Sequence, residues 1–73
     1  MKVVCSPHAL RRMKQRGVKM AQIKAVISKP IATVRQANGR MKVIGTLASG
    51  GRLAVVYKQT KTQIIIVTVH HAN

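Results

Sequence analysis

Apolar positions near the N-terminus recur first at extended spacing and then at helical spacing. The apolar run Val3-Val4-Cys5 predicts a short strand over 2–5. A helix is predicted over 7–16, because Ser6 can cap its first turn and Pro7 suits the first helical position. Gly17 can adopt the left-handed conformation that often follows the last turn of a helix. A strand followed by a helix is therefore expected to open the domain.

The apolar faces of two helices are expected to form one side of the core. In the first helix Leu10 and Met13 share a face, and Val18 is expected to pack beneath them. A second helix is predicted over 20–28 and should end before Pro30, because the residue before a proline avoids helical conformation. Its apolar positions recur at helical spacing, as Met20, Ile23, Val26 and Ile27.

The rest of the chain alternates between strand-like segments and turn residues. Segments 31–37 and 40–47 flank Asn38-Gly39, a dipeptide typical of a tight hairpin. Two further strands are predicted at 52–59 and 63–70, and the last is apolar on both faces, which predicts an interior position. The order β-α-α-β-β-β-β predicts one α+β domain, an antiparallel sheet with two N-terminal helices packed on one face.

The charge balance is the most unusual property of the chain. Of 73 residues, which suit a single domain over 1–73, 14 are Lys or Arg and none is Asp or Glu, so the net charge is +14. This composition excludes a glycosidase carboxylate pair, a Ser-His-Asp triad and an acidic Ca²⁺ or Mg²⁺ site. Because 47% of the residues are hydrophobic, we expect a folded domain and not a disordered basic tail. The charge predicts a polyanionic partner.

Cysteine content and apolar runs predict a cytoplasmic protein with no membrane association. The single cysteine, Cys5, cannot form an internal disulfide and is expected to be a buried, unreactive thiol. No signal peptide is recognised, and the longest apolar run, at 64–69, is far shorter than the ~20 residues that span a bilayer.

Cationic residues on the first helix are the first candidates for binding. His8, Arg12 and Arg16 are spaced four apart and share one face, with Lys19 just beyond and Arg11 beside them. Because no acidic residue can pair with them, we interpret this face as a surface for RNA phosphates, although a solvated helix face is the alternative. The predicted strands and turns add further phosphate-binding candidates: Arg35, Arg40, Lys42, Arg52, Lys58 and Lys61.

The histidine pair and the single aromatic residue leave several interpretations open. Adjacent strand residues point to opposite faces, so His70 and His71 cannot chelate one metal ion, and neither a metal site nor a cofactor is expected. Either histidine could contact RNA, act as a general acid or base, or have no chemical role. Tyr57 could stack on a base or pack against the sheet.

The segment from Ser6 to Val18 reads S-x-H-A-L-x-R-M-x-x-R-G-V. It resembles the opening of a family of small domains of uncharacterised function allied to the RelE/ParE toxin superfamily. Lys29-Pro30 at the end of the second helix, the sequence Gly-Arg-Leu-Ala-Val-Val at 51–56 and the sequence Ile-Ile-Ile-Val-Thr-Val at 64–69 are also similar to that family. The resemblance implies a RelE-like fold and descent from toxins, among them proteins that act on RNA at the ribosome.

The chain departs from these relatives in its lack of acidic residues. Relatives usually carry Glu at places such as 11, 15, 21 and 22, where this chain has Arg, Gln, Ala and Gln. Loss of negative charge from exposed helix positions favours a helix surface that is stably bound to RNA. The leading hypothesis is therefore a ribosomal or stably ribosome-associated protein without catalytic activity, which binds rRNA by neutralising its phosphates.

The main alternative is an endoribonuclease toxin, an mRNA interferase that is neutralised by an acidic antitoxin. In that case catalysis is assigned to residues that can bind charge or move protons: His8, Arg12, Arg16, Tyr57 and His70. A DNA-binding or architectural protein is a third hypothesis.

Overall fold

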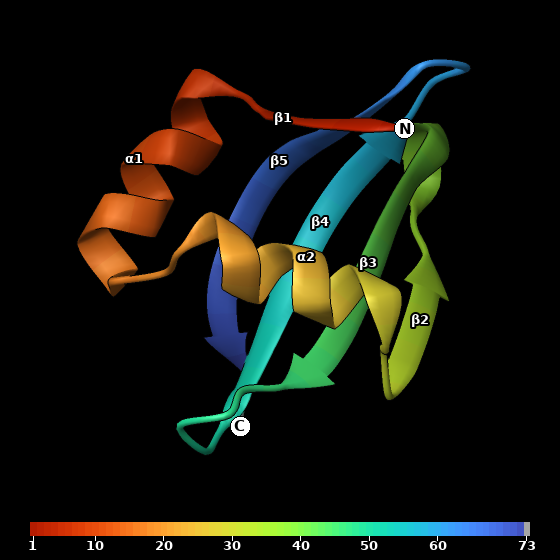
Figure 1. Cartoon of the computed structure of the whole chain (residues 1–73). Helices are drawn as coiled ribbons and strands as arrows, with labels where there is room; N and C mark the ends of the chain where they lie inside the picture. Colours follow the sequence, from red (N-terminus) through yellow and green to blue (C-terminus); the bar gives the residue numbers. More distant parts are fainter. Residues whose placement is uncertain (73) are drawn as a thin grey trace.

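The computed structural model describes residues 1–72, which form a five-stranded sheet with two helices (Figure 1). In the described residues no helix is both long and apolar enough to cross a bilayer. The predicted α+β order of elements is confirmed, and both helices have the predicted bounds. In chain order the elements are β1 (Lys2–Cys5), α1 (Pro7–Arg16), α2 (Met20–Ser28), β2 (Ala32–Arg35), a 3₁₀ turn (Ala37–Gly39), β3 (Arg40–Thr46), β4 (Arg52–Gln59) and β5 (Gln63–Ala72).

The strands lie in the order β1-β5-β4-β3-β2, so β5 is an interior strand, as its two apolar faces predict. Four strands form antiparallel pairs, but β1 runs parallel to β5. The prediction of a wholly antiparallel sheet is therefore wrong at β1. The parallel register pairs Val3 with Ile64 and Cys5 with Ile66, so apolar side chains of both strands lie on the helix side of the sheet.

Capping interactions define α1. The Ser6 Oγ accepts a hydrogen bond from the backbone N–H of Ala9 at 3.1 Å, and Gly17 has a φ of 65°. The helix buries Ala9 and leaves Leu10 50% exposed, so the predicted burial of Leu10 is wrong. The Ser6 N–H also donates to the carbonyl of Ile66 at 3.0 Å, which holds the first turn close to β5, where the small Ala9 side chain fits.

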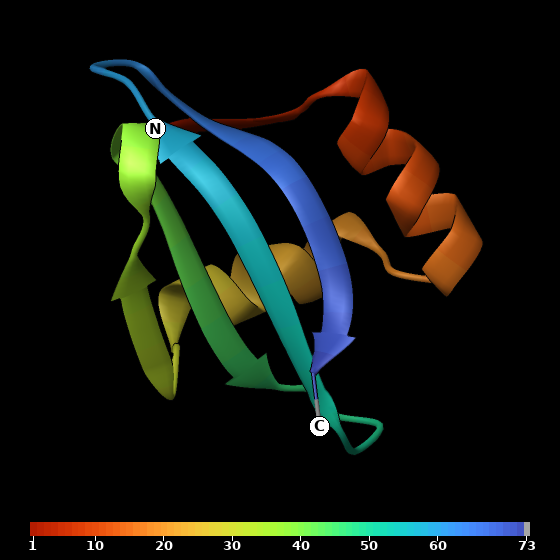
Figure 2. The same cartoon turned by 180° about the vertical axis from the view of Figure 1, so that it is seen from behind.

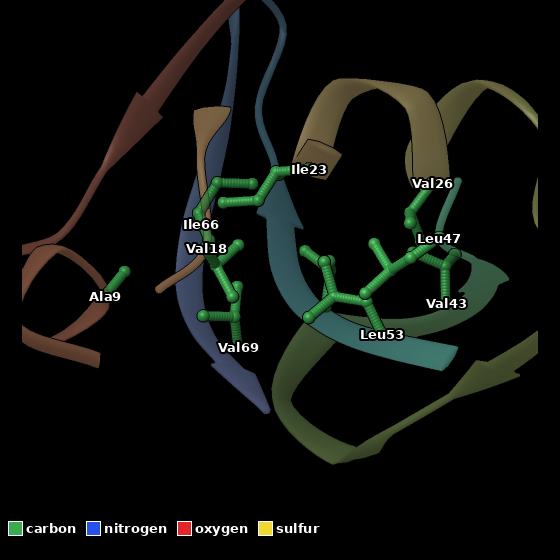
Figure 3. Close-up of a cluster of buried hydrophobic side chains, with 10 residues drawn as sticks. Ala9, Val18, Ile23, Val26, Val43, Leu47, Leu53, Ile66 and Val69 are labelled. Carbon is green, nitrogen blue, oxygen red and sulfur yellow. The ribbon is translucent and has the colours of Figure 1, made fainter. Parts of the chain in front are cut away.

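The core lies between the helices and one face of the sheet (Figure 3). Ile23 and Val26 of α2 are buried there, and Val18 is buried in the connection between the helices. Met13 packs against this cluster from α1, as predicted. Figure 1 shows α2 crossing the strands, whereas α1 lies beside β5 at the sheet's edge. The buried cluster consists of Ala9, Val18, Ile23, Val26, Val43, Leu47, Leu53, Val55, Ile66 and Val69.

The hairpin between β2 and β3 forms at the predicted place, although its first strand is shorter than the predicted 31–37. Asn38 and Gly39 have φ values of 63° and 73°, the left-handed conformation that this turn needs. All four residues of β2 are exposed, because the strand is at the edge of the sheet. At the other end of the chain, β5 extends to Ala72, past the predicted end at residue 70.

Candidate nucleic-acid interface

One face of the sheet has no helix over it, and Figure 2 shows this face toward the viewer. We call it the uncovered face. Strand alternation defines its residues, because Val43 and Val55 pair with each other and pack in the core, so their neighbours along each strand point the other way. The strands carry six Lys or Arg residues, and the registers place all except Arg35 on the uncovered face: Lys2, Arg40, Lys42, Arg52 and Lys58.

Small and aliphatic residues form the floor of this cationic face. Ala54 and Val56 are buried although no helix covers them. Neighbouring side chains of the same face must therefore cover them, and the registers place His70 beside Ala54 and Lys42 beside Val56. An apolar floor surrounded by cations can bind a polyanion, because the aliphatic parts of long basic side chains pack on the floor while their charged ends contact phosphates.

His70 is the titratable group at the centre of this arrangement. Partial burial lowers the pKa of His70, and the positive charges of Lys42 and Arg16 lower it further. These two cations come from different elements, Lys42 from β3 and Arg16 from the last turn of α1. We call His70, Lys42 and Arg16 the His70 cluster. Because its pKa lies below the ordinary value, the imidazole is mainly neutral at neutral pH, and both positive charges act on it. Such a group is suited to be a general base that acts on a phosphate ester.

His71 lies on the opposite face from His70, as alternation predicts. Its register partner is Leu53, which is buried under the helices, whereas His70 pairs with Ala54. The Nε2 of His71 lies 3.2 Å from the carbonyl oxygen of Arg16 at the end of α1. The two adjacent histidines therefore have different neighbours.

The other candidates on α1 lie farther from the cluster. Arg12 is half-buried, and its guanidinium donates a 3.5 Å hydrogen bond to the Oε1 of Gln15. His8 is exposed in the first turn, and eight residues of helical rise, about 12 Å, separate it from Arg16. Arg11 is also exposed. The predicted stripe thus brings only its C-terminal member, Arg16, to the cluster.

The remaining predicted residues are distributed over other surfaces. Tyr57 packs against the buried core on the helix side of the sheet and so lies on the opposite face from His70. Arg35 is on the edge strand β2, Lys61 is in the turn between β4 and β5, and Lys19 is in the connection between the helices. These residues do not join the His70 cluster.

Two features of the interface are absent from the sequence prediction. The sequence alone does not single out Lys2, and it does not predict that the strand cations lie together on one face. The even spacing of Arg40 and Lys42, and of Arg52 and Lys58, is the signal that could have revealed a shared face within each strand.

Neither a metal site nor a reactive thiol is found among residues 1–72. No group of three or more His, Cys, Asp or Glu side chains lies close enough to hold a metal ion. The Cys5 Sγ is 3.6 Å from the Sδ of Met13, and burial raises the pKa of this thiol, which disfavours the reactive thiolate.

Comparisons with known proteins place the chain in a family. A family described as a domain of unknown function, DUF4258, matches residues 5–71. The chain belongs to the DUF4258 family. No curated protein matches the sequence. Among solved structures, the Brucella abortus ribonuclease toxin BrnT is similar to this DUF4258 chain, with a TM-score of 0.76 and 17% identity, over 100% of this chain and 97% of that one.

The family match confirms the resemblance to a domain family of uncharacterised function, and the structural likeness confirms the predicted fold. It also overturns the leading hypothesis for this DUF4258 chain. A ribosomal protein bound to rRNA is not supported, because the solved structure that shares the fold is a ribonuclease toxin. The toxin alternative agrees better with that finding.

Proposed function

We propose that the protein is a ribonuclease toxin that cleaves RNA on the uncovered face of its sheet. The observation that carries this proposal is the His70 cluster, an imidazole with a lowered pKa beside Lys42 and Arg16 on a cationic surface. The likeness in fold to a ribonuclease toxin supports the same conclusion. RNA phosphates would bind to the strand cations, and the cluster would lie at the bond that is cut.

The chemistry follows from the properties of the three side chains. Neutral His70 accepts the proton of a ribose 2′-hydroxyl, whose oxygen attacks the adjacent phosphorus. Lys42 and Arg16 stabilise the negative charge that develops on the phosphate oxygens. The bond to the 5′-oxygen breaks, this oxygen takes a proton from water, and the imidazolium returns its proton to the solvent. The products are a 2′,3′-cyclic phosphate and a 5′-hydroxyl.

The charge also defines the kind of protein partner in this proposal. A chain with 14 Lys or Arg residues and no acidic side chain can make no salt bridges between its side chains, so a protein that neutralises it must supply the acidic groups. We therefore propose that an acidic antitoxin binds to the uncovered face. The activity belongs in the cytoplasm, where RNA is available and the unpaired Cys5 thiol remains reduced.

The test is cleavage of a single-stranded RNA by the purified full chain and its variants. His70→Ala should lower the cleavage rate by about 10²–10⁴-fold, the usual contribution of a general base, while RNA binding persists. Lys42→Ala should also slow cleavage. Lys24→Ala is a matched control, because it removes the same charge from the exposed surface of α2 and should leave the rate unchanged. Full activity in His70→Ala, or no cleavage by the unmodified chain, would contradict the proposal.

A further inference from the structure

The end of α1 is joined to the end of β5 by one side chain. The carbonyl of Arg16 belongs to the last turn of the helix, where carbonyls have no partner within the helix. The turn at Gly17 provides no donor for the Arg16 carbonyl, because the N–H groups of Gly17 and Val18 both donate to the carbonyl of Met13. The Nε2 of His71, 3.2 Å away, is the partner. Because a carbonyl oxygen only accepts, this nitrogen must carry the hydrogen.

Hydrogen bonds fasten α1 to β5 at both ends. At the N-terminal end, the backbone N–H of Ser6 donates to Ile66 at 3.0 Å and its hydroxyl donates to the carbonyl of Val67 at 3.2 Å. At the C-terminal end, the bond between His71 and Arg16 is the corresponding attachment in the described residues. Between the two ends, α1 contributes only Ala9 and Met13 to the core packing.

We infer that His71 is a positioning residue, which holds the C-terminal end of α1 against β5 and thereby keeps Arg16 beside His70. The effect of His71 on catalysis rests on the proposed ribonuclease function, whereas its contact with α1 does not depend on that function. His70 and His71 are adjacent in β5 but have different roles, because His70 faces the side that would bind RNA and His71 faces α1. The partial negative charge at a helix C-terminus also favours a donor at this place.

The inference predicts a measurable change at His70, which faces Lys42 of β3 and Arg16 of α1 and shares its face with Arg52 of β4. The test is an NMR titration of the His70 ring in the full chain. Arg16→Gln should raise the pKa of His70 toward its ordinary value. His71→Ala should raise the pKa of His70 by a similar amount. The double variant His71→Ala/Arg16→Gln should have nearly the same pKa as Arg16→Gln alone, because both substitutions act through one contact.

Two variants separate this role from a general loss of stability. His71→Gln keeps an N–H donor and should leave the pKa of His70 at its original value. Lys14→Gln removes a charge from the same last turn of α1 and should move that pKa less than Arg16→Gln does. The inference is overturned if His71→Ala leaves the pKa of His70 unchanged, or if His71→Gln behaves like His71→Ala.

Cleavage assays then connect the position of Arg16 with catalysis. His71→Ala should slow RNA cleavage by the same factor as Arg16→Gln, and His71→Gln should restore the rate. Because the titration uses no RNA, the two proposals can fail separately. If the pKa shifts occur in a chain that cleaves no RNA, His71 retains its positioning role and only the ribonuclease function is refuted.

Discussion

The protonation of His70 is the residue property on which the proposed chemistry depends. Burial, Lys42 and Arg16 lower the pKa of His70 below its ordinary value of 6.5, so the folded protein binds this proton less readily than the unfolded chain. Between the lowered pKa and 6.5 the unfolded chain carries more protons, and stability therefore rises with pH. The stabilising effect is complete above pH 6.5 and is lost as the pH falls toward the lowered value.

This linkage predicts an acid-dependent loss of stability. The free energy of unfolding should decrease as the pH is lowered below 6.5, and His70→Gln, which cannot become charged, should reduce this decrease. Denaturant titrations of both proteins at a series of pH values would measure the effect. An identical pH dependence in the two proteins would show that His70 is not perturbed by its neighbours.

The sequence predicts the opposite orientations of His70 and His71, because strand alternation is a local property. It does not predict their partners. Lys42 is on another strand, and the registers of β3, β4 and β5 bring it to the face of His70. Arg16 is on a helix more than fifty positions earlier, and the packing of α1 against β5 brings it to this end of the strand. The same limit explains Tyr57, whose residue type allows catalysis but whose register partner Met41 places it on the helix side.

At the scale of the elements, the contact between α2 and β3 requires a residue without a side chain. A Cβ at Gly45 would lie 3.0 Å from the Cγ1 of Val26 and 3.2 Å from its Cα. The backbone atom cannot move without shifting α2, so the helix owes its position across the sheet to this glycine.

Gly45→Ala should therefore lower the free energy of unfolding by about 1–3 kcal/mol, the usual cost of overpacking a core. Thr46→Ala is a suitable control, because the neighbouring side chain is exposed and its loss should change stability by less than about 0.5 kcal/mol. Thermal or denaturant unfolding provides the comparison. Equal stability of the two variants would mean that α2 does not approach β3 this closely.

Local signals predict the bounds of elements better than their pairing. The Ser6 cap, the left-handed Gly17 and the stop before Pro30 define both helices, because each depends on a few neighbouring residues. The parallel pairing of β1 depends instead on β5 at the far end of the chain. Burial of Ala9 in place of Leu10 has the same origin, because it follows from how closely α1 packs against β5.

At the scale of the whole molecule, the number of charges predicts a polyanionic partner, whereas their arrangement indicates what the protein does with it. A net charge of +14 is expected for any protein that binds a polyanion, so it cannot separate a ribosomal constituent from an enzyme that acts on RNA. The absence of acidic residues from exposed helix positions favours the first, but it says nothing about where the cations lie in the fold. The fold instead brings five strand cations to the uncovered face and places one histidine with a lowered pKa among them.

The central claim is that this face cleaves RNA by using the ribose 2′-hydroxyl. The most direct test compares a long single-stranded RNA of mixed sequence with a DNA of the same sequence, each incubated with the purified chain. We predict that both are bound, that only the RNA is cut, and that its fragments end in 2′,3′-cyclic phosphates and 5′-hydroxyls. RNA that remains intact, or DNA that is cut as readily as RNA, would contradict the account.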